Sequence, residues 1–200
     1  MKTKRIVGII LIILSATLIF LGCGEKEREN PKIQVEMENG DIFIIELYPE
    51  YAPETVKNFE KLVKEGFYDG LIFHRVYEGF MAQGGGYNVG DYLFETGNKK
   101  PADSIKGEFA ENGYSKNTLK HTRGVISMAR TQVMDSASSE FFIMYDSNVG
   151  LDNKYAAFGK VIEGMEAVDK FLEGEKWIGM DDIPTHPVEP IIIKKMTVIN

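Results

Sequence analysis

The sequence predicts a mainly β domain with two helices, preceded by a separate N-terminal segment. Short apolar, β-prone runs recur from residue 33 to residue 199, whereas only two stretches show helical periodicity. The basic and apolar start of the chain ends at its single cysteine. About eight short strands with two helices favour a closed or nearly closed antiparallel barrel whose ends the helices cover. The pattern alone does not distinguish a barrel from a β-sandwich.

The composition is that of an ordinary globular protein of about one domain, with 200 residues, 44% hydrophobic and 26% charged. One cysteine excludes an intramolecular disulfide framework and a cysteine-based zinc cluster. The net charge is −7, and the 20 basic and 30 acidic residues that follow segment 1–22 give the body a charge of −10. This acidity argues against nucleic acid as a partner.

The first 22 residues are predicted to be a signal peptide. Lys2, Lys4 and Arg5 precede an uncharged run from Ile6 to Gly24, which is the form of a secretory signal. As a helix this run would reach about 28 Å, just enough for a permanent membrane anchor. A cleaved signal that releases a soluble protein is a third possibility. All three place the body outside the cytoplasm.

The cysteine favours the lipoprotein form of this signal. Phe20-Leu21-Gly22-Cys23 resembles a bacterial lipobox, in which the cysteine is lipidated and becomes the new N-terminus. We therefore expect a lipid on Cys23 that holds the protein to the cell membrane on its extracytoplasmic face. Residues 23–31 would be the lipidated cysteine and a charged tether that ends in Pro31, followed by the domain over 32–200.

The domain is expected to begin with a hairpin and a helix. Ile33–Met37 and Ile42–Leu47 are predicted strands, and Asn39-Gly40 between them suits a type I′ turn. Pro53 is typical of the first turn of a helix, and Gly66 follows the end of this helix.

Six further strands and one further helix complete the domain. The predicted strands are Leu71–Val76, Phe80–Gln83, Gly124–Ala129, Phe141–Tyr145, Ala156–Val161 and Ile191–Ile199. A second helix is predicted from Gly164, with Met165, Val168 and Leu172 on one side. The long polar stretch from Tyr87 to Lys120 is expected to form ordered loops.

Three other patterns do not support a function. Gly84–Gly86 lacks the Lys-Ser/Thr of a phosphate-binding loop, so we expect a turn between strands there. The three histidines, His74, His121 and His186, have no metal-ligand spacing, so no metal is expected. The serines of 136–139 are not in the Gly-x-Ser-x-Gly pattern of a hydrolase.

Three ordered motifs identify a family. The first comprises Phe73-His74-Arg75, Gly79-Phe80-Met81 and Gln83-Gly84-Gly85; the second comprises 124–131 with 138–143; the third is 151–161. Together they resemble the cyclophilin-type peptidyl-prolyl cis-trans isomerases over residues 32–200. The resemblance implies a closed eight-stranded antiparallel β-barrel capped by two α-helices. It implies proline-containing polypeptides as partners and no cofactor. Nothing in the sequence suggests an oligomer, so we expect a monomer.

The resemblance also implies the residues of the site. Rotation about an X–Pro bond breaks amide resonance and localises a lone pair on the proline nitrogen, so a donor aimed at that nitrogen stabilises the twisted state. Arg75 would be this catalytic donor. The implied substrate-binding residues are Phe80, Met81, Gln83, Ala129, Arg130, Thr131, Phe142, Leu151 and Tyr155. Without the resemblance, Arg75 would be an ordinary strand arginine, Gln83 a strand-end residue, and the apolar residues plain core. His74 is expected to be structural.

Four positions depart from the family pattern. Gly150 stands where many members have tryptophan, Tyr155 where histidine is frequent, Glu140 for a common glutamine and Arg130 for a common asparagine. Because the tryptophan borders the drug pocket in the family, we expect weak binding of cyclosporin with isomerase activity retained.

The predicted function is therefore isomerisation of X–Pro bonds in secreted or surface proteins, which would assist their folding. The alternative is a module or chaperone holdase that binds proline-containing segments with little turnover. A structural surface protein is a more distant possibility.

Overall fold

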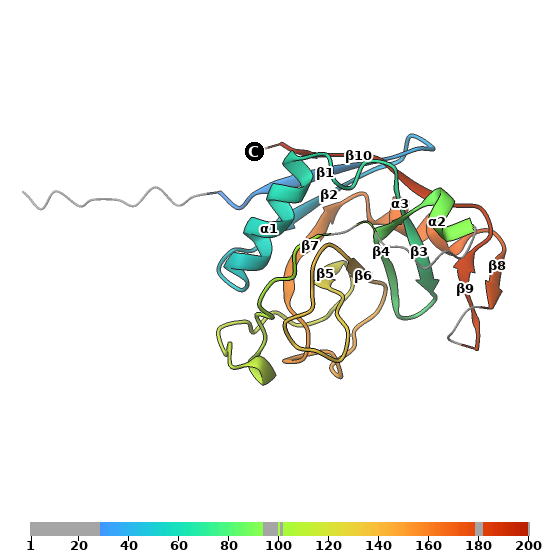
Figure 1. Cartoon of the computed structure of the whole chain (residues 1–200). Helices are drawn as coiled ribbons and strands as arrows, with labels where there is room; N and C mark the ends of the chain where they lie inside the picture. The colour runs from blue at the N-terminus through green and yellow to red at the C-terminus, as the bar shows by residue number, and fades with distance from the viewer. Residues whose placement is uncertain (1–28, 94–99, 101, 179–181, 200) are drawn as a thin grey trace, which may run out of the picture.

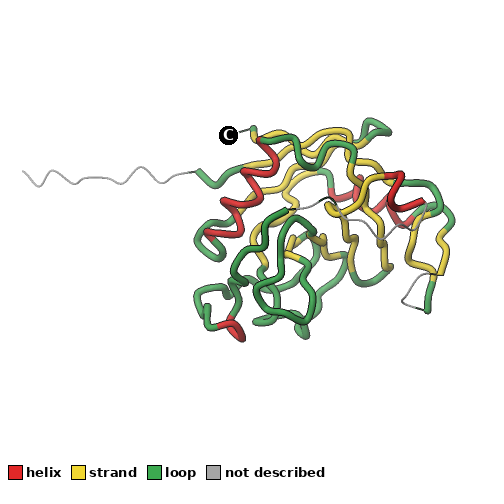
Figure 2. The backbone as a smooth tube through the Cα atoms, in the orientation of Figure 1, coloured by secondary structure: helices red, strands yellow, loops and turns green. Residues whose placement is uncertain are grey.

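Eight strands close into an antiparallel barrel, as the sequence predicts (Figures 1 and 2). The computed structural model describes residues 29–93, 100, 102–178 and 182–199. The order around the barrel is β1-β10-β3-β4-β6-β5-β7-β2, and β2 pairs with β1 to complete it. The predictions for the signal peptide (1–22) and for Cys23 lie outside the described residues.

The barrel strands agree with the predicted runs within a few residues, except that β4 extends five residues further. Their bounds are β1 (Lys32–Met37), β2 (Ile42–Leu47), β3 (Leu71–Tyr77), β4 (Met81–Asn88), β5 (Val125–Met128), β6 (Phe141–Met144), β7 (Ala157–Glu163) and β10 (Ile191–Val198). Alternate residues of β1 and β2 point into the barrel: Ile33, Val35 and Met37 are buried opposite Phe43, Ile45 and Leu47. This period of two is what fixes the register of the first hairpin.

The turn of this hairpin differs from the prediction. The N–H of Gly40 donates to Met37 O at 2.9 Å, and Gly40 alone in the turn has a positive φ, of 86°. Asn39 keeps a negative φ, so the type I′ prediction is wrong. The loop has three residues, with glycine in the left-handed position, and the Asn39 side chain accepts the N–H of Asp41 at 3.0 Å.

Both predicted helices are present, and Figure 1 shows them on different sides of the barrel. They are α1 (Pro53–Lys64) and α3 (Met165–Asp169), the latter continued by the 3₁₀ turn η2 (Lys170–Leu172). The ring of Phe59 on α1 contacts Phe141 and Phe158, with centroids 5.3 and 5.1 Å away. Phe171 after α3 contacts Phe73, with ring centroids 4.8 Å apart. Each helix thus adds aromatic rings to the barrel core.

A carboxylate from a distant segment caps α1. Ala52 at the N-cap has no side chain that could do so. Instead Glu108, which is 3% exposed, accepts the N–H groups of Glu54 at 3.1 Å and of Thr55 at 2.8 Å. A negative charge at this end of a helix is favoured by the helix dipole. The contact ties the stretch that contains Glu108, part of the region from Tyr87 to Lys120 predicted as ordered loops, to α1. This stretch also contains the short helix α2 (Val89–Leu93) and the 3₁₀ turn η1 (Ala110–Asn112).

The three glycines predicted to form a turn lie inside β4 instead. A side chain at Gly84 would be 2.8 Å from Ile72 O, and one at Gly86 would be 2.5 Å from a carboxylate oxygen of Glu140. Gly85 has a φ of 84° where the β3–β4 register shifts. The glycines are there because the strand is bulged and closely approached, which is a second reason for glycine besides turning.

One hairpin was not predicted. Strands β8 (Lys176–Ile178) and β9 (Pro184–Pro187) form a separate two-stranded sheet beside the barrel. The rings of Trp177 and His186 pack across it with centroids 4.5 Å apart. Three- and four-residue strands that contain two prolines carry too weak a β pattern to be recognised.

Candidate active site

A cavity of about 230 Å³ lies on the outer surface of the barrel beside β3, β4 and β6. Nine residues line it: Arg75, Phe80, Met81, Gln83, Ala129, Arg130, Phe142, Leu151 and Tyr155. These are nine of the ten catalytic and substrate-binding residues predicted from the sequence. They come from segments separated by up to 80 positions, and the barrel brings them together.

Arg75 reaches the cavity because β3 is bulged. Phe73 pairs with Gly84, but Arg75 pairs with Gln83, so β3 has one extra residue at this point. As a result, Phe73 and Val76 both face the barrel core, although their spacing of three would normally put them on opposite faces. Arg75, between them, is directed outward. Bulges commonly redirect a side chain beside an active site.

Gln83 is held by a buried carboxylate. Its Nε2 donates to Glu140 Oε2 at 2.7 Å, and Glu140 is 7% exposed. Because the carboxylate only accepts, this bond fixes which end of the Gln83 amide faces Glu140. His74 Nε2 lies 3.9 Å from the same oxygen, so His74 stands behind the site, in keeping with its expected structural role.

The apolar wall of the cavity is a cluster of its own, outside the barrel core. Met81, Phe142 and Met144 are buried in it, and Phe80, Leu151 and Tyr155 pack against them while remaining partly exposed. Phe142 and Tyr155 meet edge to face, with centroids 5.9 Å apart. This cluster forms the apolar side of the cavity of about 230 Å³.

Arg130 is fixed at the rim of the cavity by rings and carbonyls. Its Cζ lies 4.6 Å from the ring centre of Tyr155 and 5.0 Å from that of Phe109. Its Nε and Nη2 donate to Lys154 O at 3.0 and 2.9 Å. Two of the positions that depart from the family pattern, 130 and 155, are therefore in contact with each other.

Thr131 is the predicted site residue that does not line the cavity. Its N–H donates to Ser136 Oγ at 3.0 Å, and its carbonyl accepts from Arg130 Nη1 at 2.9 Å. The N–H of Ala129 donates to Glu140 O at 2.9 Å. A substrate strand along 129–131 would pair through the other backbone groups of this segment.

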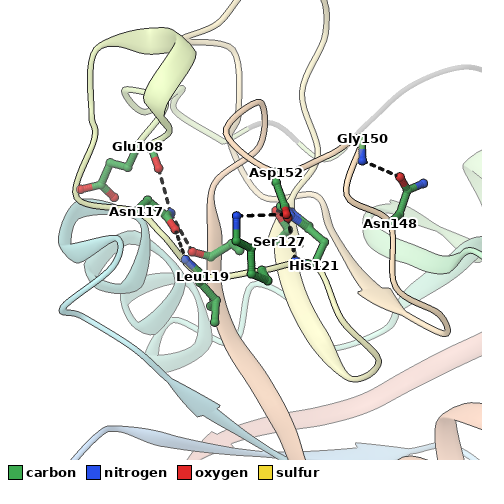
Figure 3. A network of polar contacts seen from close by, with 10 residues as sticks. Glu108, Asn117, Leu119, His121, Ser127, Asn148, Gly150 and Asp152 are labelled. Carbon is green, nitrogen blue, oxygen red and sulfur yellow. Dashed lines mark hydrogen bonds and ion pairs between the residues drawn. The ribbon is translucent and has the colours of Figure 1, made fainter.

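A buried chain of polar groups behind the cavity was missed by the sequence analysis (Figure 3). His121 Nδ1 lies 3.1 Å from Asp152 Oδ1, and His121 Nε2 lies 3.0 Å from Ser127 Oγ. The His121 ring is stacked on Phe142, with an interplanar angle of 18°. The three residues lie on separate segments, so no motif spacing reveals them.

This serine, histidine and aspartate do not form a nucleophilic site. Ser127 is 0% exposed, so its hydroxyl cannot reach a substrate. Burial lowers the pKa of His121, and the contact with Asp152 offsets this only in part. A neutral ring therefore donates through Nδ1 to Asp152 and accepts the Ser127 hydroxyl at Nε2. The network supports the wall formed by Phe142.

Gly150 leaves the rim of the cavity without a side chain beside Leu151. Its N–H donates to Asn148 Oδ1 at 2.9 Å (Figure 3). The N–H of Leu151 donates to Asn148 O at 3.2 Å. The turn that presents Leu151 is thus held by its own hydrogen bonds, with no wall contributed by residue 150.

No group of three or more histidine, cysteine or acidic side chains in the described part of the chain could hold a metal ion. Among the same residues, no helix has both the length and the apolar character needed to cross a bilayer.

Comparison with known proteins gives one consistent family. Residues 32–198 match the family model described as cyclophilin type peptidyl-prolyl cis-trans isomerase/CLD. The peptidyl-prolyl cis-trans isomerase of Acinetobacter baylyi is 44% identical over 174 residues, which are 82% of this chain and 85% of that protein. Peptidyl-prolyl cis-trans isomerase B of Escherichia coli is 41% identical over 171 residues, 80% and 94% of the two chains.

A solved structure of a protein with this activity in its name has a similar fold. The crystal structure of a cyclophilin-type peptidyl-prolyl cis-trans isomerase from Cryptosporidium parvum, determined in the presence of the dipeptide Ala-Pro, superposes with a TM-score of 0.67 at 28% identity. The match covers 84% of this chain and 99% of that chain.

Proposed function

The chain belongs to the family of cyclophilin-type peptidyl-prolyl cis-trans isomerases, and we propose that it catalyses this reaction with Arg75 in the cavity beside β3, β4 and β6. One observation supports this assignment most: a guanidinium, an anchored amide and an apolar surface line the same small cavity. Arg75 and Gln83 lie opposite each other in register, and Phe142 and Leu151 complete the recess.

The proposed mechanism requires neither a nucleophile nor a proton transfer. The proline ring enters the apolar recess, and Gln83 binds the substrate backbone near the bond that rotates. As the amide twists, its nitrogen becomes pyramidal and its lone pair, delocalised in the planar amide, is localised on it, where the Arg75 guanidinium donates a hydrogen bond. Because this bond is made only in the twisted state, it lowers the barrier, by about 1.4 kcal/mol for each tenfold gain in rate.

The catalytic role of Arg75 is tested by measuring the rate of cis-to-trans isomerisation of a peptide. The full chain in detergent should accelerate isomerisation of a short X–Pro peptide, and removing a donor used only in the transition state costs about 10²- to 10³-fold. We expect Arg75→Ala to show this loss, with peptide affinity retained. If the unmutated chain binds the peptide without accelerating it, the alternative of a proline-binding module or holdase is correct.

The location is a second part of the proposal. Lys2, Lys4 and Arg5, the apolar run after them and the lipobox that ends at Cys23 support a lipid-anchored protein on the extracytoplasmic face of the cell membrane. Its substrates there would be secreted or surface proteins during folding. No cofactor is part of the proposal, and the protein is expected to act as a monomer.

Lipidation is tested by mass and by fractionation. The mature protein should begin at Cys23 and carry the mass of its acyl chains, and it should partition with membranes. Cys23→Ala should leave the signal uncleaved and unlipidated. A mature protein of unmodified mass in the soluble fraction would contradict the proposal.

A further inference from the structure

The cavity of this acidic chain has a cationic lining. The chain carries a net charge of −7, yet among the described residues that line the cavity are two arginines and no carboxylate. The buried carboxylate of Glu140 lies behind Gln83 and accepts from its amide at 2.7 Å. A cationic recess on an acidic surface favours anionic ligands over cationic ones.

Arg130 is the second of these two cations, at a position where the family pattern commonly has asparagine. Its guanidinium contacts the rings of Tyr155 and Phe109 and donates three hydrogen bonds, two to Lys154 O and one to Thr131 O. These contacts use three of its five N–H donors. The side chain has little freedom left to lose on binding, so the charge is preorganised at the rim.

We propose that Arg130 determines substrate specificity by favouring an acidic side chain next to the proline. This inference rests on the proposed function, because the acidic residue is placed by the proline that occupies the recess. Two N–H donors of the guanidinium remain for a carboxylate, and its contacts with the two rings and the two carbonyls hold it in place. A basic residue at the same substrate position would meet like charge from both Arg130 and Arg75.

The expected preference is moderate. Two opposite charges about 6 Å apart at an effective dielectric constant of about 40 to 80 change a rate or binding constant by roughly three- to tenfold. At about 1 M salt the screening length is about 3 Å, so most of this preference should disappear.

The experiment compares matched peptides on the full chain in detergent. Peptides with Glu, Gln or Lys directly before the proline, and a second set with these residues directly after it, are assayed for kcat/KM at low salt. We expect Glu to exceed Gln by about three- to tenfold in at least one set, with Lys below Gln. Isomerisation of the Gln peptides reports the proposed function by itself, so its absence would refute that function and not merely this preference.

Variants separate charge from packing. In Arg130→Gln the Glu-to-Gln ratio should fall about threefold or more, whereas Arg130→Lys should retain most of it because the charge stays. Lys194→Gln is the matched control: it removes one positive charge from an exposed pair with Glu36 on the β1–β10 side, and should leave the ratio unchanged. An unchanged ratio in Arg130→Gln, or an equal loss on all peptides, would overturn the inference and leave Arg130 only a support for Tyr155.

Discussion

Replacing Ser127 by alanine tests the buried network behind the active site. Burial keeps the His121 ring neutral, so its Nε2 is an acceptor that the Ser127 hydroxyl satisfies at 3.0 Å. Both side chains are fully enclosed, at 0% exposure for Ser127 and for the His121 side chain. Ser127→Ala removes the donor, and bulk water cannot replace it because neither side chain is exposed.

The cost follows from the unsatisfied acceptor. A buried polar group left without a partner destabilises a protein by about 1–3 kcal/mol. For a chain of this size each kcal/mol shifts Tm by about 2–4 °C, so a loss of about 2 kcal/mol should lower Tm by about 4–8 °C. The assay is thermal unfolding followed by circular dichroism, with urea unfolding as a check. Ser147→Ala, an exposed serine in the same region, is the matched control and should change Tm little. Equal effects of the two substitutions would refute the argument.

Three further outcomes are expected. Glu108→Ala removes the carboxylate that caps α1 through Thr55, and should lower the free energy of unfolding in urea by about 2 kcal/mol; a change under about 0.5 kcal/mol would contradict this capping role. Because burial lowers the pKa of His121 below 6.5, the unfolded chain binds more protons in acid, so stability should be complete above pH 6.5 and fall as the pH drops below it. His121→Gln should flatten that part of the urea-unfolding pH profile, and an unaltered slope would show that other groups cause it. Gly150 provides no wall beside Leu151, so cyclosporin titrations should show weak inhibition; nanomolar inhibition would refute the expectation.

Much of the fold was predictable because its signals are local. The runs at 33–37 and 42–47 alternate in the barrel as their pattern predicts, and Pro53 does begin the first helix. The local predictions that were wrong concern glycines, because glycine occurs in a chain for several different structural reasons. Gly40 supports a three-residue loop and Gly86 makes room for Glu140, and neither purpose is visible without knowing which segment lies opposite.

The candidate site was also predictable only in part. The motif resemblance identified Arg75, Gln83 and Phe142 as site residues. Their convergence on one cavity depends on the bulge in β3, which no sequence pattern predicts. The network of His121 with Asp152 was out of reach because its members are 31 positions apart and their hydrogen bonds arise only from tertiary packing. The contact of Arg130 with Tyr155 is likewise not predictable from sequence, although each residue by itself departs from the family pattern.

The first and last strands of the barrel have a mechanical consequence. Ile33 at the start of β1 pairs with Val198 at the end of β10, and Ile199 N–H donates to Lys32 O at 3.0 Å. A force that pulls the two ends of the domain apart therefore acts across the ladder from one end and opens its hydrogen bonds one after another. Each contributes only about 1 kcal/mol, so the domain should unzip under small loads. The same pull would leave the ladders of β4, β6 and β5 around the cavity until last, because these strands lie on the far side of the barrel from β1.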